Sequence, residues 1–549
     1  MKKFLTEKNY QKSILRITVP VGILLGFMFS FGFFLEKSGE VHFANPRVWL
    51  LVLGASIVLV AATSLIFVGL DVYSKKDSKV QLKLPENRKQ WGLVFLILVL
   101  CYTITFLAVF PGFFAYDAKM AHWSYYYDQI TTQHPWIHTI LLGYICEFSI
   151  SHLGHANVGI AIYIYVQMLF VAGCFTYTLY TMAKRTGHRV VVMISFLYYA
   201  LFPTIHMYAL CTTKDTLFTA VFLVALVLLL DMFEDADAFF SSKGKQISFV
   251  LFVLAALILR KNAVYAMIVF IPFLLVFLKK NWKKGAVLVG LSFLLFWVYD
   301  KPLANAVGVI DIGPKEALSV PSQQLARVYN EEREILTEEE RSLLETFYPK
   351  EYLERYLPKL ADYAKGMLNT EYFMENTGEY LKLWASVGAR VPDIYINSFL
   401  VNTYGFWYPT ATLDGYDGFD GIVGTPIENA EVYYFAYETE SPGERWSLIP
   451  LLDNFYYQLS TKNLHTRVPG VSLLFSPGFM FWVYVIAFAY SVYRKQKASY
   501  PVFILMGILW LTVLLGPIAL VRYVLFLFFG LPLLLSALFK KENCVNEEI

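Results

Sequence analysis

Long apolar runs recur along most of this chain, and they constrain its fold more than any other feature of the sequence. Many of these runs are as long as a helix that crosses a bilayer, which takes roughly 20 residues. Only 16% of the 549 residues are charged and the mean hydropathy is +0.50, whereas soluble domains carry about 25% charged residues. The sequence therefore predicts an all-α polytopic membrane protein.

We expect about twelve transmembrane helices, each placed on one apolar run. The expected spans are residues 17–35, 47–70, 91–110, 157–182, 190–208, 216–232, 246–260, 263–279, 285–299, 471–493, 499–519 and 521–539. The first run follows a basic N-terminus but is not followed by a small-residue cleavage site, so we interpret it as a retained helix rather than a signal peptide.

Lysine and arginine in the short loops predict the orientation, because such loops stay on the cytoplasmic side. With both termini in the cytoplasm, every basic short loop falls on that side, including Lys75–Lys89, Lys184–Arg189 and Arg494–Lys497. The apolar stretch His134–Ser151 would invert every later loop if it crossed the membrane, so we expect an outer juxtamembrane helix that lies in the interface. The predicted location is the cell membrane, with several passes.

This topology divides the chain into three parts. An N-terminal transmembrane module at residues 1–299, with an outer loop at 111–156, is followed by an acidic segment at 300–469 and by C-terminal transmembrane helices at 470–549. The acidic segment is predicted to be a mixed, soluble, extracytoplasmic domain. Its helical stretches are expected at Glu331–Glu345, Glu351–Met367 and Glu371–Val387. The aromatic stretch Asp393–Pro409 is expected to return toward the membrane.

Acids and aromatic residues gather in the outer loop, directly after the third expected span. Asp117 ends the motif PGFFAYD, and the aromatic residues around it would partly desolvate its carboxylate. Desolvation raises the pKa of an acid and makes it a usable general base near neutral pH. Asp128 lies three helical turns later and would share a face with Asp117 if the loop is helical. Solvated loop positions are the alternative interpretation for both acids.

His134 and His138 follow at a spacing of four residues, which can be a metal-ligand spacing. No glutamate completes the HExxH pattern of zinc proteases, so hydrogen bonding to a substrate is favoured over metal binding. The acids of Asp414–Gly421 are spaced by three residues rather than alternating as in an EF-hand, which favours a glycine-rich turn. No cofactor is indicated with certainty, and a divalent metal stays open without a ligand cluster that demands one.

Positive charges at the outer helix ends are the most informative residues, because the other short-loop cations are expected on the inner side. Ionisable groups at such positions are costly and mark functional sites by default. Arginine binds phosphate as a fork and lysine as a point charge. The alternative is snorkelling toward outer headgroups. The outer cations are Lys214, Arg260, Lys261 and Arg522. Nucleotide-binding glycine motifs and a periodic basic face are absent from the sequence, which argues against a nucleic-acid partner.

These motifs resemble the GT-C superfamily of integral membrane glycosyltransferases, which includes protein O-mannosyltransferases and lipid A aminoarabinose transferases. The strings PGFFAYD, LFPTIHMYALCTTKD, LRKN and GPIALVRY are similar to a poorly characterised bacterial branch of that superfamily. The mannosyltransferases carry an Asp-Glu pair where this chain has Asp117-Ala118. The second acid is therefore open, with Asp215 ahead of Asp128.

The resemblance implies inverting transfer of a sugar from a polyprenyl-phosphate-linked donor to an extracytoplasmic acceptor, which is a cell-surface glycan, a lipid-linked glycan or a protein. Asp117 would take the proton of the acceptor hydroxyl, and Asp215 would be the second catalytic acid. The donor phosphate would be bound by Lys214, Arg260, Lys261 and Arg522. Substrate positioning would fall to Tyr116, Asp128, Gln133, His134, His138 and Tyr523.

Two alternatives from other functional classes share the many spans and outer cations. One is a flippase or transporter of a lipid-linked saccharide, which would need charges near mid-bilayer and broken helices in paired halves. The other is a polysaccharide polymerase or ligase that uses a polyprenyl-diphosphate donor.

Overall fold

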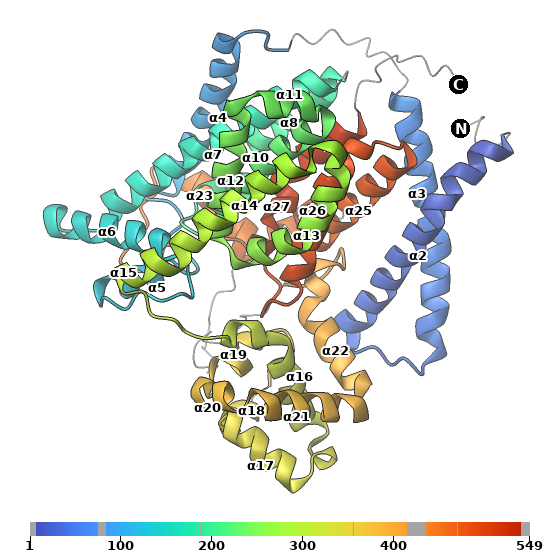
Figure 1. Cartoon of the computed structure of the whole chain (residues 1–549), viewed down its shortest axis with the longest axis vertical. Coiled ribbons are helices and arrows are strands. Elements are labelled where there is room, and N and C mark those ends of the chain that lie inside the picture. The colour runs from blue at the N-terminus through green and yellow to red at the C-terminus, as the bar shows by residue number, and fades with distance from the viewer. Residues whose placement is uncertain are drawn as a thin grey trace.

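The computed structural model describes residues 7–74, 84–186, 188–354, 356–413, 434–468 and 470–539. Within these ranges the regular elements are helices, and extended segments meet only at two isolated bridges, Phe113 with Cys211 and Thr131 with Ile310. A bundle of apolar helices carries a separate helical module at one end (Figure 1). The all-α prediction is confirmed for the described residues.

The bundle is built mainly from long helices, with several short helices between them. In chain order its elements are α2 (Lys8–Ser38), α3 (Pro46–Ser74), α4 (Arg88–Ala108), α7 (Asn157–Arg185), α8 (Arg189–Leu201), α9 (Pro203–Ala209), α10 (Lys214–Glu234), α11 (Ala236–Ser241), α12 (Lys243–Leu259), α13 (Lys261–Leu278), α14 (Trp282–Val298), α15 (Ala304–Val307), α24 (Val471–Phe475), α25 (Pro477–Tyr493), α26 (Tyr500–Val513), the 3₁₀ turn η8 (Val521–Val524) and α27 (Leu525–Leu538). Helix α10 lies at the centre, because it contacts α7, α12, α26 and α27 and is buried along most of its length. Four neighbouring helices therefore hold α10 in place.

Among the described residues, seven stretches are long and apolar enough to cross a membrane, and the bent pair α8–α9 raises the number to eight. A multi-pass membrane protein is therefore supported, with fewer long spans than the twelve expected. Two expected spans, now α13 and α14, fall within one candidate stretch, Lys261–Val307. Others form shorter helices, with 17 residues in α12 and α25 and 14 in α26. In α26 the helix ends at Val513, before the apolar run does.

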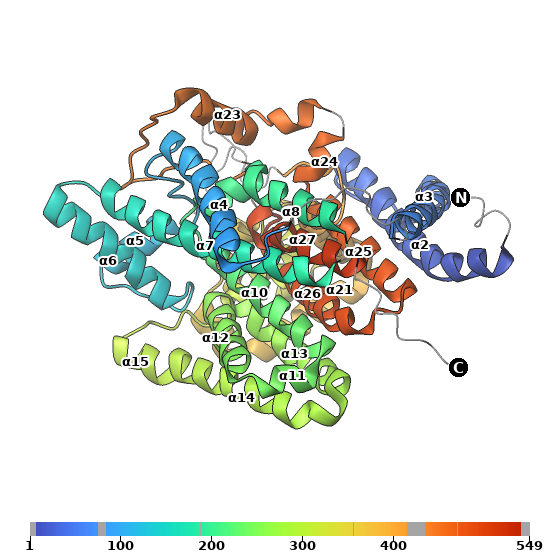
Figure 2. The same ribbon diagram turned by 90° about the horizontal axis from the view of Figure 1, so that it is seen from above.

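Helices α2 and α3 form a hairpin at one side of the bundle (Figure 2). The two backbones approach closely at Gly26, where an added Cβ would lie 2.2 Å from the Ser56 side chain. Small residues permit this close packing of membrane helices. The buried Asp71 of α3 accepts hydrogen bonds from Tyr490 and Tyr493, which attach the hairpin to α25.

The outer loop contains two further helices, α5 (Ala118–Tyr126) and α6 (Trp136–Leu153). Helix α6 is not among the candidate spans, and it projects sideways from the bundle (Figure 1). One of its faces exposes an apolar stripe at helical spacing, formed by Ile137, Leu141, Tyr144 and Phe148. An exposed stripe of this kind suits a helix that lies in a membrane interface, as the sequence predicts for this stretch.

The module at the end of the bundle is helical, so the prediction of a mixed domain is wrong for its described residues. Its elements are η3 (Lys315–Leu318), α16 (Ser319–Glu331), η4 (Arg333–Ile335), α17 (Glu338–Phe347), α18 (Lys350–Leu353), α19 (Ala361–Gly366), α20 (Thr370–Glu375) and α21 (Thr377–Arg390). Leu325, Tyr329, Leu344 and Tyr380 are among the residues of its own buried core. The three expected helical stretches are broken into shorter helices, and α16 was not expected.

The chain leaves the module through α22 (Pro392–Thr403), which leads back to the bundle as expected for that aromatic stretch. The Trp482 indole N–H of α25 donates to the Trp407 carbonyl at 2.9 Å. Gly478 packs against the Tyr408 backbone, where an added Cβ would lie 2.3 Å from the Tyr408 oxygen. The junction between the module and the bundle is therefore tightly packed.

Residues 434–468 do not belong to the module but run along the surface of the bundle; we name them the return segment. Their helix α23 (Pro450–Thr461) contacts α4. Backbone hydrogen bonds join the segment to the end of α4, from Leu448 N–H to Leu107 O at 3.0 Å and from Trp446 N–H to Phe110 O at 2.8 Å. The soluble segment predicted at residues 300–469 includes this stretch.

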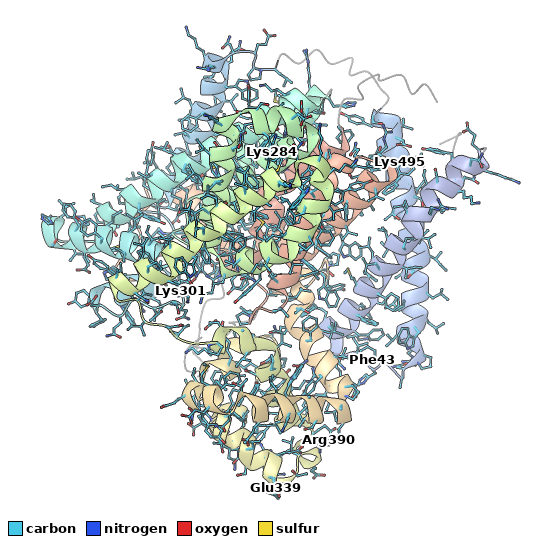
Figure 3. The ribbon with its side chains drawn as sticks, viewed as in Figure 1. Phe43, Lys284, Lys301, Glu339, Arg390 and Lys495 are labelled. Atoms are coloured by element: carbon cyan, nitrogen blue, oxygen red, sulfur yellow. The ribbon has the colours of Figure 1, made fainter. Side chains whose placement is uncertain are left out.

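Charged side chains lie at both ends of the molecule. Lys284 and Lys495 lie toward the end of the bundle that is far from the module, whereas Glu339 and Arg390 lie on the module (Figure 3). The predicted topology assigns the first two residues to the cytoplasmic side and the other two to the outer side.

Candidate functional site

The outer loop is fastened to the turn that precedes α10. The Phe113 N–H donates to the Leu210 carbonyl at 2.9 Å, and the Thr212 N–H donates to the Phe113 carbonyl at 3.0 Å. This short extended pairing holds two segments together that lie about a hundred residues apart in the sequence. Asp117 and Lys214, which follow the two paired segments, are thereby brought side by side.

Two cations converge on one oxygen atom of Asp117. The Lys214 ammonium donates to Asp117 Oδ2 at 2.6 Å, and Arg522 Nη1 of η8 donates to the same oxygen at 3.0 Å. The Lys214 ammonium also donates to Nδ1 of His134 at 2.7 Å. The side chain of Asp117 is 27% exposed, whereas that of Arg522 is 7% exposed. Three distant regions of the chain therefore meet at one carboxylate that is partly open to solvent.

Asp215 extends this arrangement into the protein. Its fully buried carboxylate lies 2.9 Å from Arg260 Nη1 and 3.8 Å from Arg522 Nη1. Arg260 precedes α13 and Asp215 stands in the first turn of α10, where an acid is favoured by the helix dipole. Arg522 contacts both acids, so Asp117 and Asp215 belong to a single charged network.

Aromatic rings orient the two arginines. The Arg522 guanidinium lies 4.4 Å from the ring centroid of Tyr116 and 4.9 Å from that of Tyr523, and the Arg260 guanidinium lies 5.0 Å from the Tyr523 ring. Cation–π contacts of this kind are attractive and directional. Tyr116 has a φ of 60°, a left-handed conformation that costs a bulky residue about 1–3 kcal/mol. The backbone is therefore held in an unfavourable conformation directly before Asp117.

The charges determine the protonation states of the network. Burial opposes ionisation of Asp117, but Arg522 and Lys214 hold the pKa of this carboxyl well below its ordinary value. Burial and the Lys214 charge lower the pKa of His134 to about 3 and that of His138 to about 4. At neutral pH Asp117 is thus ionised and both imidazoles are neutral. The expected rise of the Asp117 pKa is wrong, because the two cations outweigh burial.

The structure does not bring every predicted site residue into the network. Lys261, Asp128 and Gln133 are exposed, and within the described residues their side chains make no ion pair with Asp117 or Asp215. Lys261 follows Arg260 directly but stands at the first position of α13, and Asp128 lies in the turn after α5 with a φ of 53°. Of the four cations predicted to bind phosphate, Lys214, Arg260 and Arg522 lie in the network.

His138 and Tyr523 lie at the edge of the network. The His138 imidazole is buried, packs edge-on against the Tyr163 ring at 5.9 Å, and interacts electrostatically with Lys214. The Tyr523 ring lies between the two arginine contacts described above. These two predicted residues contribute shape and local polarity rather than charge.

Two acids outside the predicted set of site residues also face the network. Glu438 and Glu440 lie on the return segment, where Glu440 N–H donates to Phe114 O at 2.8 Å. Glu438 interacts electrostatically with Arg522, and Glu440 interacts with Asp117. No motif in the sequence connects this segment with the outer loop, because the two are more than three hundred residues apart.

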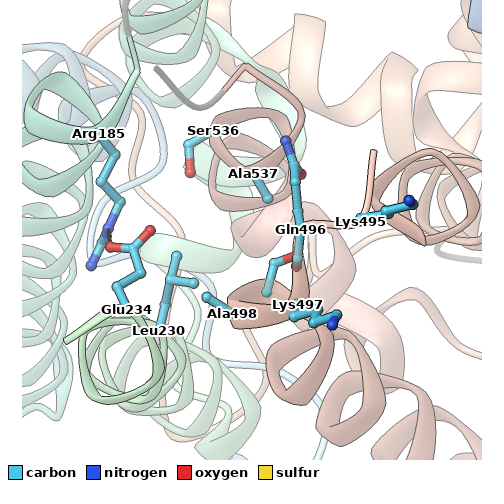
Figure 4. A pocket seen from close by; sticks show the side chains of 10 residues that line it. Arg185, Leu230, Glu234, Lys495, Gln496, Lys497, Ala498, Ser536 and Ala537 are labelled. Atoms are coloured by element: carbon cyan, nitrogen blue, oxygen red, sulfur yellow. Dashed lines mark hydrogen bonds and ion pairs between the residues drawn. The ribbon is translucent and has the colours of Figure 1, made fainter. Parts of the chain in front are cut away.

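A separate cavity of about 200 Å³ lies elsewhere in the bundle (Figure 4). Arg185, Glu234 and Lys495 are among its lining residues, and none of the predicted site residues lines it. Among the described residues, no group of three or more His, Cys, Asp or Glu side chains is arranged to hold a metal ion. The Asp414–Gly421 stretch lies outside the described residues.

Comparisons with known proteins identify a family but no relative of known activity. No curated protein and no solved structure matches the chain. One family model matches residues 121–548, a region that begins just after Asp117 and contains Lys214, Asp215, Arg260 and Arg522. Because the match covers well over half of the sequence, the chain belongs to the family described as DUF6020, a family of unknown function.

Proposed function

We propose that this protein is a membrane glycosyltransferase that moves a sugar from a polyprenyl-phosphate-linked donor to an extracytoplasmic acceptor by inverting displacement. The observation that carries the proposal is the convergence of Lys214, Arg260 and Arg522 with two acids at the ends of separate helices. A GT-C-like resemblance of the same residues supports the same class of reaction. The acceptor is a cell-surface glycan, a lipid-linked glycan or a protein.

The geometry around Asp117 is that of an anion site. Two cationic groups donate to the same oxygen, and the carboxylate that carries this oxygen is partly exposed. A phosphate oxygen offers the same charge and hydrogen-bond acceptors, and arginine and lysine are its usual partners. We propose that the donor phosphate shares or replaces the contacts of Lys214 and Arg522 with Asp117.

The reaction needs stabilisation of the leaving phosphate more than it needs an acid. When the acceptor oxygen attacks the anomeric carbon, the bond from that carbon to the phosphate oxygen breaks and negative charge grows on the phosphate. Preorganised cations at this position lower the barrier, and the loss of one such donor typically costs about 10²–10³ in rate. Lys214, Arg260 and Arg522 supply this charge. Asp117 and Asp215 hold them in position, and the role of Asp117 as general base stays a prediction.

The proposed location follows from the distribution of charge. With the basic loops and both termini in the cytoplasm of a cell-membrane protein, the predicted topology would put the Asp117 network and the helical module outside. A polyprenyl chain would stay in the bilayer while its phosphate meets the network at headgroup level. The bilayer, the lipid-linked donor and the outer acceptor are thus the proposed partners.

A polymerase or ligase with a polyprenyl-diphosphate donor is the second candidate, because three cations also suit two phosphate groups. The two reactions differ in the lipid product. Transfer from a monophosphate donor releases polyprenyl phosphate, whereas transfer from a diphosphate donor releases polyprenyl diphosphate. Identification of the released lipid by mass spectrometry decides between them.

The proposal is tested by replacing Asp117 with asparagine in cells that otherwise lack the protein. We expect the wild-type chain to change the surface glycans, as measured by mass spectrometry. Asp117→Asn should abolish this change when the two proteins are present at equal level. The matched control is Asp300→Asn, an outer acid whose only described ion pair is with the neighbouring Lys301 at 3.3 Å. Normal glycans with Asp117→Asn, or identical glycans with and without the wild-type protein, would contradict the proposal.

A further inference from the structure

The return segment is bonded directly to the loop that carries Asp117. Glu440 N–H donates to the Phe114 carbonyl at 2.8 Å, and the Thr439 hydroxyl donates to the Gly112 carbonyl at 2.9 Å. Arg445 lies above the Phe113 ring, with its guanidinium 5.0 Å from the ring centroid. The return segment therefore forms one wall of the site.

The two acids of this wall face different parts of the network. Glu438 is half-buried and interacts with Arg522, while Glu440 interacts with Glu438, with Lys119 of α5 and with Asp117. The Oε2 atom of Glu440 is buried and has no hydrogen-bond partner among the described residues. A buried carboxylate oxygen is unfavourable unless a donor reaches it. The hydroxyl group of a substrate is such a donor.

We propose that Glu440 is the proton acceptor of the transfer reaction and that the return segment forms the acceptor side of the site, opposite the phosphate-binding cations. This inference rests on the proposed function. The acceptor oxygen forms a bond to the anomeric carbon while the bond from that carbon to the phosphate oxygen breaks. The bonding electron pair leaves with the phosphate, and the hydroxyl proton passes to the Glu440 carboxylate.

The electrostatics favour Glu440 over Asp117 in this role. Burial and the negative charge of Glu438 raise the pKa of Glu440 to about 7, against an opposing effect of Lys119. A general base is most effective when its pKa lies near the working pH. Asp117 is stabilised as an anion by Lys214 and Arg522, and is therefore a weak base.

The test is the pH dependence of transfer in vesicles that expose the outer face of the protein. A polyprenyl-phosphate sugar is supplied as the donor, and the release of polyprenyl phosphate is measured. For the wild-type protein we expect the rate to fall as the pH falls below about 7, because Glu440 becomes protonated. Glu440→Gln should lower the rate by roughly 100-fold or more and abolish this acid limb, with donor binding unchanged. Glu438→Gln should move the limb to lower pH, since it removes the like charge. Glu444→Gln, at an exposed position of the same segment, should change neither.

In the transfer assay, either of two results would overturn the inference: a wild-type rate and acid limb in Glu440→Gln, or an unmoved limb in Glu438→Gln. The titration itself can be followed without any donor, by infrared difference spectroscopy of the protonated carboxyl group. A band with a midpoint near pH 7 should be present in the wild-type protein and absent in Glu440→Gln. Absence of a band with this midpoint from the wild-type protein would refute the role of Glu440. Failure of the wild-type protein to bind the donor would instead refute the proposed function.

Discussion

Replacement of Arg522 by alanine removes a side chain that contacts both acids of the network. Arg522 Nη1 lies 3.0 Å from Asp117 Oδ2 and 3.8 Å from Asp215 Oδ2, and the guanidinium is nearly fully buried. After the substitution Asp117 still pairs with Lys214, and Asp215 still pairs with Arg260. The loss should therefore fall mainly on donor binding and catalysis rather than on folding.

The magnitude follows from the phosphate contact that Arg522 would make. A hydrogen bond to a charged group contributes about 1.5–3 kcal/mol, which corresponds to a roughly 10- to 150-fold change in a dissociation constant. We expect Arg522→Ala to weaken the binding of polyprenyl phosphate by this factor. Arg522→Lys should be intermediate, because lysine keeps the charge but lacks the fork.

The assay measures equilibrium binding of radiolabelled polyprenyl phosphate to the full-length protein in lipid nanodiscs. Lys301→Ala serves as the control, since Lys301 is 59% exposed and its ion pair within the described residues is with the neighbouring Asp300. Thermal unfolding of each variant shows whether the fold persists. Wild-type affinity in both Arg522→Ala and Arg260→Ala would refute the idea that these arginines bind the donor phosphate.

Two further predictions concern stability. The pKa of His134 is lowered to about 3, below its ordinary value of 6.5, so the unfolded chain binds more protons than the folded protein between these pH values. The stability of the protein should therefore fall as the pH drops from 6.5 toward 4. Thermal unfolding at pH 7 and pH 5 should show a smaller fall for His134→Gln. An equal acid sensitivity of the two proteins would contradict the assignment. At the hairpin, Gly26→Ala should destabilise the protein by about 1–3 kcal/mol, because the new Cβ would lie 2.8 Å from the Ser56 backbone. Gly54→Ala, on an open face, should not destabilise it. Equal melting temperatures of the two variants would refute the close approach at Gly26.

Much of the architecture could be predicted from local properties of the chain. Backbone N–H and C=O groups inside a membrane must find hydrogen-bond partners within the protein, and a helix satisfies them within one apolar run. Hydropathy therefore predicts an all-helical multi-pass protein. Helix α6 was expected outside the set of spans because of the loop charges around it. Span number was less predictable, since a helix can end before its apolar run does, as α26 does at Val513.

The site could be predicted in part. Cations at outer helix ends are costly, which predicts a functional role for Lys214, Arg260 and Arg522. The structure brings these three residues together. Lys261 satisfied the same criterion and lies outside the network, because consecutive residues at a helix start point in different directions. Neither composition nor spacing distinguishes Arg260 from Lys261.

The sequence by itself determined the membrane class, the expected sidedness of the loops and the residue types at the outer surface, because hydropathy and charge act locally along the chain. Tertiary structure decided which of these residues meet. It lowered the pKa of Asp117 by placing two cations on one of its oxygens, and it brought Glu440 beside the outer loop from a segment assigned to another domain. Electrostatic effects depend on distance in space, and the distances between remote segments arise only when the bundle packs.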